Sequence, residues 1–252
     1  MKGIAETRAR STLDGMTKKL QIDIWSDIAC PWCYIGKRHL EAALAAFPHA
    51  NDVEIVWRAF ELNPAAPKLE PASGGSYASR LAKKYGFSVK AAEEKLQSMT
   101  EVAAKDGLDF RFDRIKPGNT FDAHRIVHLA AERGKQGAVK ERLLRAYMTE
   151  GEAMSDHDAL VRLASEAGLD EDDARAVLAS DTYAAEVRAD EREAHQIGIS
   201  GVPFFVIGRY GVSGAQPAAE LRKVLEKAWT EAPELVEASV VEGASCGVDG
   251  CI

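Results

Sequence analysis

Hydrophobic patterning divides the chain into strand-containing ends and a helical middle. Apolar and polar residues alternate over residues 20–25, and β-branched and aromatic residues are dense over residues 53–60, so we predict a strand in each segment. Between them, apolar residues recur at helical spacing from Tyr34 to Phe47, and Pro48 ends the pattern. The order strand, helix, strand predicts a βαβ unit.

Strand signals return near the end of the chain. Residues 203–207 and 210–213 are rich in apolar residues, and a Gly-Arg pair separates them, so they predict a β-hairpin. Pro217 then opens a predicted helix that ends near residue 229.

The region between these strand-containing segments is predicted to be helical. Residues 64–75 shift to Pro, Gly, Ala and Ser, which is typical of a linker. After it, the one strand-like stretch before residue 198 is residues 108–112. Glycines at positions suited to helix C-caps divide the region into about five or six helices; they are Gly86, Gly107, Gly134, Gly151 and Gly168. The predicted N-caps are Asn119, Ser155 and Asp170.

Together these patterns predict an α/β domain that a helical unit interrupts. The chain then divides into a flexible leader at residues 1–19, the α/β domain at residues 20–66 and 197–230, a helical insertion domain at residues 67–196, and a mobile tail at residues 231–252.

Composition excludes several classes of function. Hydrophobic residues make up 46% of the 252 residues, charged residues make up 28%, and the formal net charge is −7. This charge gives no basic footprint, so neither nucleic acid nor membrane is an expected partner. No apolar stretch approaches the roughly 20 residues that span a membrane. Residues 1–19 also lack the apolar core of a secretory signal, so we expect a cytoplasmic protein that starts at Met1 or Met16.

The four cysteines form two close pairs, Cys30 with Cys33 and Cys246 with Cys251. In a reducing cytoplasm such pairs are more often catalytic, redox-sensing or metal-binding than structural. The C-x2-C spacing also occurs in zinc knuckles. Because the first pair opens a helix after a strand, and the second has C-x4-C spacing without an adjacent histidine, we favour redox chemistry and expect no bound metal.

The position of the first pair predicts different roles for its two thiols. Cys30 stands at the N-cap of the predicted helix, with Pro31 as its first residue. A thiolate there would accept hydrogen bonds from backbone N–H groups and lie at the positive end of the helix dipole, which lowers its pKa. We therefore expect Cys30 to be the nucleophile. Cys33, one turn further on, would resolve the mixed disulfide.

At these motifs the sequence resembles DsbA-like thioredoxin-fold oxidoreductases of the FrnE type. The matching segments are residues 27–36 around the Cys-Pro-Trp-Cys run, residues 57–64, residues 119–125, residues 198–205 and residues 214–216. The resemblance implies a thioredoxin fold with a large α-helical insertion and a thiol–disulfide oxidoreductase that uses no cofactor. Strong oxidants of this family often carry His between the cysteines, where this chain has Pro31 and Trp32. The resemblance therefore does not imply that this protein is a strong oxidant.

The resemblance also implies a substrate site around the cysteines. Val202–Pro203 is expected to form a cis peptide bond beside them, which leaves the Val202 backbone free to pair with a substrate strand. His124 is expected to face the active site, where it either contacts substrate or transfers a proton, or simply packs against its helix. The residues themselves suggest two more roles: Trp32 and Tyr34 either form an apolar rim for unfolded chains or simply pack, and either of the flanking carboxylates Asp23 and Asp27 could help to move the Cys33 proton.

Three functional hypotheses are compatible with these residues. The leading one is a cytoplasmic protein disulfide reductase or isomerase that acts on proteins with thiols or disulfides and is recharged by a cellular reductant. A second is a glutathione-dependent enzyme like the kappa-class transferases or hydroxychromene-carboxylate isomerases, which do not need Cys33. A third is a redox-switched chaperone or binding protein.

The tail pair adds a further hypothesis. Cys246 and Cys251 lie in a Gly-rich terminus that is long enough to reach the first pair. They could form a second redox pair that relays electrons to Cys30 and Cys33. The alternative is an incidental or structural disulfide that closes a small loop.

Overall fold

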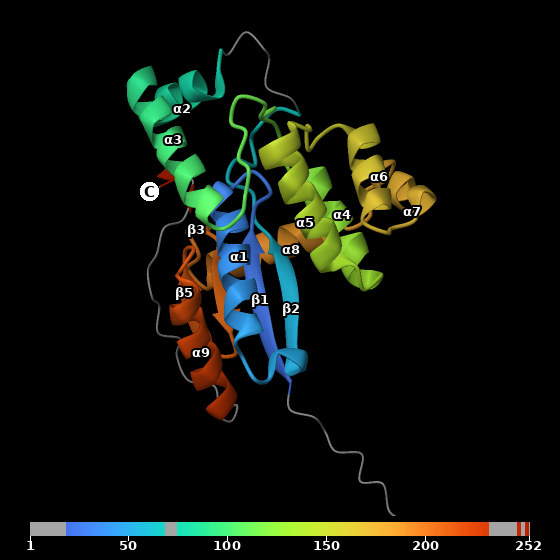
Figure 1. Ribbon diagram of the computed structural model, residues 1–252. Helices are drawn as coiled ribbons and strands as arrows, with labels where there is room; N and C mark the ends of the chain where they lie inside the picture. The colour runs from blue at the N-terminus through green and yellow to red at the C-terminus, as the bar shows by residue number, and fades with distance from the viewer. Residues whose placement is uncertain (1–18, 69–74, 232–245, 248–249, 252) are drawn as a thin grey trace, which may run out of the picture.

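The computed structural model of the protein describes residues 19–68, 75–231, 246–247 and 250–251 (Figure 1). Both candidate start positions, and most of the tail, lie outside the described residues. Strands from the two ends of the sequence meet in one sheet, and helices from the middle of the chain gather beside it (Figure 1).

The sheet is mixed and is built from β1 (Leu20–Ser26), β2 (Val53–Ala59), β4 (Phe204–Ile207) and β5 (Tyr210–Ser213). The strand order is β2-β1-β4-β5. β1 and β2 are parallel, whereas β4 is antiparallel to both of its neighbours. The first two strands are those of the predicted βαβ unit, and the last two are the predicted hairpin.

Helices cover both faces of this sheet. α1 (Pro31–Ala45) leads from β1, through the short 3₁₀ helix η1 (Ala50–Asp52), to β2, and it packs against α9 (Ala218–Thr230). On the other face, α8 (Ala184–Gln196) packs against β2 (Figure 1). The central strand is therefore buried on both sides. Trp25 of β1 is 2% exposed, and its Nε1 donates to a main-chain carbonyl oxygen of α8 at 2.9 Å.

The segment between β2 and the hairpin is helical. From residue 75 to residue 196 the structure has seven α-helices, more than the five or six predicted. All five predicted C-cap glycines have positive φ angles, between 65° and 92°, a conformation that costs glycine little because it lacks a Cβ. Before α8 come α2 (Tyr77–Tyr85), α3 (Val89–Lys105), α4 (Phe121–Glu132), α5 (Gln136–Arg145) with the π-helical turn η3 (Ala146–Glu150), α6 (His157–Glu166) and α7 (Glu171–Leu178).

Two predicted details of this region are wrong. Residues 108–112 do not form a strand: the Arg111 N–H donates to the carbonyl oxygen of Met148 at 2.7 Å, not to a neighbouring strand. Their alternate apolar side chains are buried, so the alternation reflects packing into the helical core. Two N-caps are also shifted by one residue.

Asp170 caps α7 as predicted, but Thr120 and Asp156, rather than Asn119 and Ser155, are the N-caps of α4 and α6. The Asp156 carboxylate accepts hydrogen bonds from two backbone N–H groups of the first turn, whereas the Ser155 hydroxyl donates to the carbonyl oxygen of Lys68 instead. Asn119 still supports the start of α4, because its side-chain oxygen accepts from a backbone N–H at 2.8 Å.

A second, smaller sheet joins β3 (Gly201–Val202) to two strands of the tail, β6 (Cys246–Gly247) and β7 (Gly250–Cys251). β6 lies between the other two and is antiparallel to both. These four tail residues are thus placed against β3, where the sequence predicted only a mobile tail. In the part of the chain that the structure describes, no helix is long and apolar enough to cross a membrane.

Candidate active site

The first cysteine pair opens α1 as predicted. Cys30 is the N-cap, and Pro31 is the first helical residue. The preceding loop folds back, so that the Cys30 N–H donates to the carbonyl oxygen of Asp27 at 3.3 Å, and the Cys33 N–H donates to that of Cys30 at 3.1 Å. Proline suits this first position because its missing N–H would have no partner inside the helix. Cys30 and Cys33 therefore lie one turn apart on the same helix face.

Both thiols are free and buried, with exposed fractions of 0% for Cys30 and 1% for Cys33. The Cys30 thiol makes no capping hydrogen bond with α1 and instead donates to the carbonyl oxygen of Val202, 3.5 Å from Sγ. Burial raises the pKa of the Cys30 thiol well above its ordinary value, and the Cys33 thiol adds to the shift. This direction is opposite to the low pKa expected from the N-cap position, because burial outweighs the one backbone hydrogen bond that favours the thiolate.

The Val202–Pro203 peptide bond is cis, as the family resemblance implied. Pro203 lies against α1 at Gly36, where an added Cβ would come within 3.0 Å of the Pro203 Cγ atom. Glycine at this position therefore permits the close approach of the proline loop to the helix that carries the cysteines. The result is that the Val202 carbonyl stands beside the Cys30 thiol.

Val202 is also the point where the tail meets the α/β part of the protein. In the β3–β6 ladder Val202 pairs with Cys246, and across the next ladder Cys246 stands opposite Cys251. The backbone of the second cysteine pair thus lies at the strand edge next to Cys30. The sequence indicated that the tail could reach this region but gave no docking position.

A buried carboxylate, Asp27, lies next to the cysteine loop. It accepts hydrogen bonds from the backbone N–H groups of Ala29 at 3.2 Å and Leu62 at 2.8 Å, and its Oδ1 lies 3.5 Å from Nε2 of His124. Burial alone would raise the pKa of Asp27, but His124 and these hydrogen bonds hold it below the ordinary value. Burial lowers the pKa of His124. At neutral pH the pair therefore consists of an ionised Asp27 and a neutral His124.

The buried position of His124 fits the packing role expected of it rather than direct substrate contact. His124 is 1% exposed and faces Asp27, so its side chain offers no surface to a substrate in this conformation. Asp23, the other candidate carboxylate, accepts hydrogen bonds from Arg58 and Gln21 instead of approaching the thiols.

Lys140 of α5 is a buried cation that the sequence analysis missed. It is 0% exposed, its Nζ donates to the carbonyl oxygen of Ser26 at 3.2 Å, and Nζ lies 5.5 Å from the centre of a Trp57 ring. Among the described residues, no carboxylate forms an ion pair with it. Burial lowers the pKa of Lys140 to about 8, with Cys33 and Asp27 acting in the opposite direction. A signal was present, because this lysine interrupts the apolar stripe of α5.

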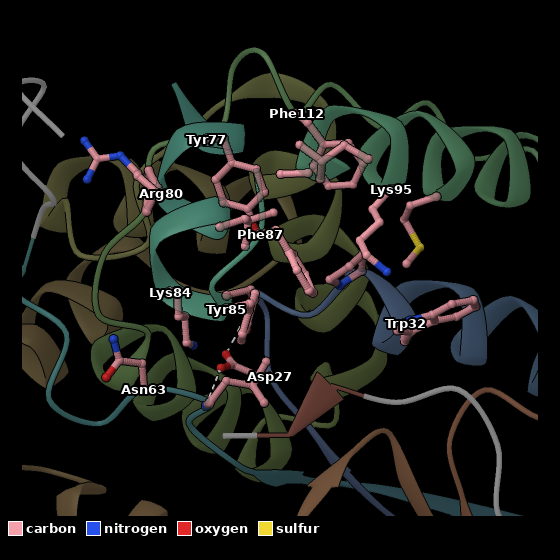
Figure 2. Close-up of a pocket in the computed structure, with 18 of the residues that line it drawn as sticks. Asp27, Trp32, Asn63, Tyr77, Arg80, Lys84, Tyr85, Phe87, Lys95 and Phe112 are labelled. Atoms are coloured by element: carbon pink, nitrogen blue, oxygen red, sulfur yellow. Dashed lines mark hydrogen bonds between the residues drawn. The ribbon is translucent and has the colours of Figure 1, made fainter. Parts of the chain in front are cut away.

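A groove with a volume of about 1480 Å³ opens beside the cysteine pair. Ala29, Pro31 and Trp32, which flank Cys30 in the sequence, line it on one side. Figure 2 shows Tyr77 and Phe87, from the hairpin of α2 and α3, among the aromatic side chains that gather across from the loop of Asp27. Trp32 therefore lies at the border of this groove.

Metal binding has no support among the residues that the structure describes. They contain no group of three or more His, Cys, Asp or Glu side chains that could hold an ion. The side chains of Cys246 and Cys251 lie outside that description.

The strand order, the dithiol at the start of the first helix and the adjacent cis proline define a thioredoxin-fold protein with inserted helices. Residues 21–226 match the family described as DSBA-like thioredoxin domain, and the chain belongs to this family. It is 31% identical over 199 residues to the uncharacterized protein YwbO of Bacillus subtilis, a match that covers 78% of this chain and 90% of YwbO.

Solved structures agree with this assignment. The probable DsbA oxidoreductase SCO1869 from Streptomyces coelicolor is 46% identical, with a TM-score of 0.79 over 92% of this chain and 98% of that one. The cytosolic disulfide reductase DsbM from Pseudomonas aeruginosa, solved with GSH, is 18% identical, with a TM-score of 0.57 over 84% of this chain and 100% of that one. The predicted DsbA-like fold with a helical insertion is therefore confirmed.

The fold alone does not choose among the functional hypotheses. A 2-hydroxychromene-2-carboxylate isomerase shares it at 16% identity and a TM-score of 0.54, covering 83% of this chain and 94% of that one. Function has to be argued from the dithiol and its surroundings.

Proposed function

We propose that this member of the DsbA-like oxidoreductase family is a cytoplasmic dithiol–disulfide oxidoreductase that reduces or isomerises protein disulfides. The observation that carries the proposal is the pair of free thiols at the start of α1, with Cys30 Sγ 3.5 Å from the carbonyl oxygen of Val202. An extended substrate that pairs with the Val202 backbone would bring its own disulfide to Cys30. Assignment to the FrnE type belongs to the same proposal.

The reaction balances within the cysteine pair. The Cys30 thiolate attacks one sulfur of a substrate disulfide, forms a mixed disulfide and releases the other substrate sulfur as a thiolate. Cys33 then loses its proton and attacks Cys30, which releases the second substrate thiolate and leaves a Cys30–Cys33 disulfide. The substrate gains two electrons and the enzyme loses two. Two cysteines one helical turn apart have the geometry for this bond.

Asp27 is the best candidate to receive the proton of Cys33. It is ionised in its buried position, and its main-chain carbonyl oxygen accepts a hydrogen bond from the Cys30 N–H at 3.3 Å, so it lies at the turn that leads into the cysteine pair. Because Cys33 is 1% exposed, bulk water has little access to its thiol, so a buried acceptor would speed the resolving step.

Insulin reduction tests the proposal. The wild-type protein should catalyse it, Cys30→Ser should not, and Cys33→Ser should accumulate mixed disulfides with the substrate. A glutathione-dependent enzyme would instead bind a glutathione conjugate and keep its activity in Cys33→Ser. A redox-switched binding protein would neither reduce insulin nor turn over a glutathione conjugate. The cytoplasmic location expected from the N-terminal sequence is tested by cell fractionation.

We propose that Cys246 and Cys251 reduce the Cys30–Cys33 disulfide after each turnover. Support comes from the ladder that places the backbone of Cys246 opposite Val202. A Cys246 thiolate attacks the Cys30–Cys33 disulfide at Cys30 and releases Cys33; Cys251 then attacks Cys246, which frees Cys30 and leaves a Cys246–Cys251 disulfide. A small cellular thiol reduces that disulfide in turn. Tethering supplies an effective concentration of order millimolar for this exchange.

Trapping tests this relay. In the Cys33→Ser, Cys251→Ser variant, oxidation should yield a Cys30–Cys246 disulfide that mass spectrometry of the digested protein detects. Absence of this cross-link, together with unchanged multiple turnover in Cys246→Ser, would show that the tail pair is only a local disulfide.

A further inference from the structure

The groove beside the cysteine pair carries charge of the opposite sign to the chain as a whole. The chain has a net charge of −7. Three lysines nevertheless line the groove: Lys83, Lys84 and Lys95. Of the two carboxylates in the described lining, Asp27 is buried, and Glu94 already lies 3.9 Å from the ammonium group of Lys90. The groove therefore presents a local positive potential.

The same groove presents aromatic surface. Phe87 is 41% exposed, although large apolar side chains are usually buried. The Lys95 ammonium group lies 5.0 Å from the centre of the Phe87 ring, and that of Lys84 lies 5.2 Å from the Tyr85 ring. Cations and aromatic rings thus alternate along the α2–α3 hairpin, and Figure 2 shows Lys84, Tyr85, Phe87 and Lys95 of this hairpin among the side chains that line the groove.

Size and position indicate a polypeptide as the occupant. The volume of about 1480 Å³ exceeds the roughly 300–1,000 Å³ of pockets for small molecules. Lining residues include Ala29 and Pro31 on either side of Cys30. A chain whose disulfide is at Cys30 would therefore continue into this groove.

We propose that the groove binds the segment of a protein substrate next to its disulfide, and that it selects segments that combine acidic and apolar side chains. Acidic groups would lie near the lysines of α2 and α3, and apolar groups would cover Phe87 and Trp32. This inference rests on the proposed disulfide exchange at Cys30 and names the substrate class of that reaction.

Matched peptides test the inference. Two peptides of about twelve residues share one internal disulfide and the same apolar residues, and differ only in four positions that are all Glu or all Lys. Pre-reduced protein is mixed with each peptide in a single turnover, so that no added reductant is needed. We expect the acidic peptide to react about tenfold faster at low salt, which converts to about 1.4 kcal/mol. The ratio should approach one near 1 M salt, because salt screens exposed charges.

Charge reversal in the groove supplies the decisive variant. Lys83→Glu, Lys84→Glu, Lys95→Glu combined should invert the preference between the peptides. The matched control combines Lys105→Glu, Lys135→Glu and Lys223→Glu, which are exposed lysines outside the lining, and it should keep the wild-type preference. Glutathione disulfide serves as the small probe, and its rate should change less than that of the acidic peptide. Urea unfolding verifies that both triple variants are folded.

The outcomes separate this inference from the proposed function. If neither peptide is reduced by the wild-type protein, the disulfide exchange itself is wrong. If both are reduced at equal rates, the exchange stands and charge selection by the groove is refuted. Charge selection is also refuted if the control variant inverts the preference, or if the groove variant changes only the glutathione disulfide rate.

Discussion

Val202 pairs with Cys246 in an antiparallel ladder, one residue before the cis proline that lies beside the active-site helix. Main-chain pairing at Val202 is also the contact proposed for a substrate strand. The tail and the substrate would therefore compete for the backbone edge of β3 at Val202. The same β3–β6 ladder also brings Cys246 and Cys251 close to Cys30 and Cys33.

Deletion of residues 244–252 should lower the KM for a peptide disulfide. Removal of β6 leaves the Val202 edge unpaired, so a substrate no longer has to displace a tail strand. Loss of about one competing backbone hydrogen bond corresponds to roughly a fivefold decrease in this KM. Single-turnover kinetics over a range of peptide concentrations measure the half-saturating concentration without any contribution from the relay. Cys246→Ser, Cys251→Ser is the control that keeps the strand, and its KM should match the wild type; an unchanged KM after deletion would show that the ladder does not restrict access.

Alkylation of Cys30 should be slow and should keep increasing above pH 9. Burial raises the pKa of this thiol, so little thiolate exists at neutral pH while Cys30 is covered. Iodoacetamide labelling of the reduced protein, with quantification of the Cys30 peptide by mass spectrometry, gives the rate at each pH. The tail-deleted protein should react faster at pH 7.5 because its Val202 edge is open. A wild-type rate that reaches its plateau below pH 7 would instead restore the low-pKa thiolate expected from the N-cap position.

Gly36→Ala should destabilise the protein and reduce its activity. Alanine in a helix usually raises the free energy of unfolding by up to about 1 kcal/mol relative to glycine. Here, however, its Cβ would lie 3.0 Å from Pro203 and 3.3 Å from the Phe205 ring. Both rings are held in place, so we expect a net loss of about 1–3 kcal/mol and slower insulin reduction as Pro203 moves away from Cys30. Urea unfolding and the insulin assay measure the two effects.

Gly137→Ala is the matched control for this substitution. Gly137 is also helical, and an added Cβ would meet no atom within 4 Å. It should be neutral or stabilising with unchanged activity. Equal stability of the two variants would show that the contact between Gly36 and Pro203 is loose.

Features that depend on neighbouring residues were predictable from the sequence. Cys30 becomes the N-cap because a proline follows it directly, and the βαβ unit and the hairpin follow from periodicity over short segments. The cis bond at Pro203 followed from the family resemblance. These elements suffice to identify the fold and to place the first cysteine pair at the start of α1.

Features that depend on distant contacts were not predictable. The Cys30 thiol is covered by a contact with Val202, 172 residues away, and the resulting burial reverses the expected pKa shift. Lys140 reaches the carbonyl oxygen of Ser26 across 114 residues. Periodicity along one segment specifies which face is buried, but it does not specify which partner buries it.

The buried charge of Lys140 should make stability rise with pH. Its pKa is about 8 in the folded protein, where burial disfavours the charged form, and near 10.4 in an unfolded chain. Between these values the unfolded state binds more protons than the folded state, so the free energy of unfolding increases with pH in that window. Below pH 8 both states are largely protonated, and the full cost of burying the ammonium group remains.

Lys140→Met removes this ionisation and keeps a long, flexible side chain. From pH 7.5 to pH 9.5 the wild type should gain about 2 kcal/mol of unfolding free energy relative to the variant. Urea unfolding of both proteins at each pH gives the difference, and titrations that they share cancel from it. Lys105→Met, an exposed position at the end of α3, is the control and should show no such trend. A difference between wild type and Lys140→Met that stays constant over this range would mean that Lys140 titrates as a hydrated lysine, and that α5 opens to water beside the cysteine pair.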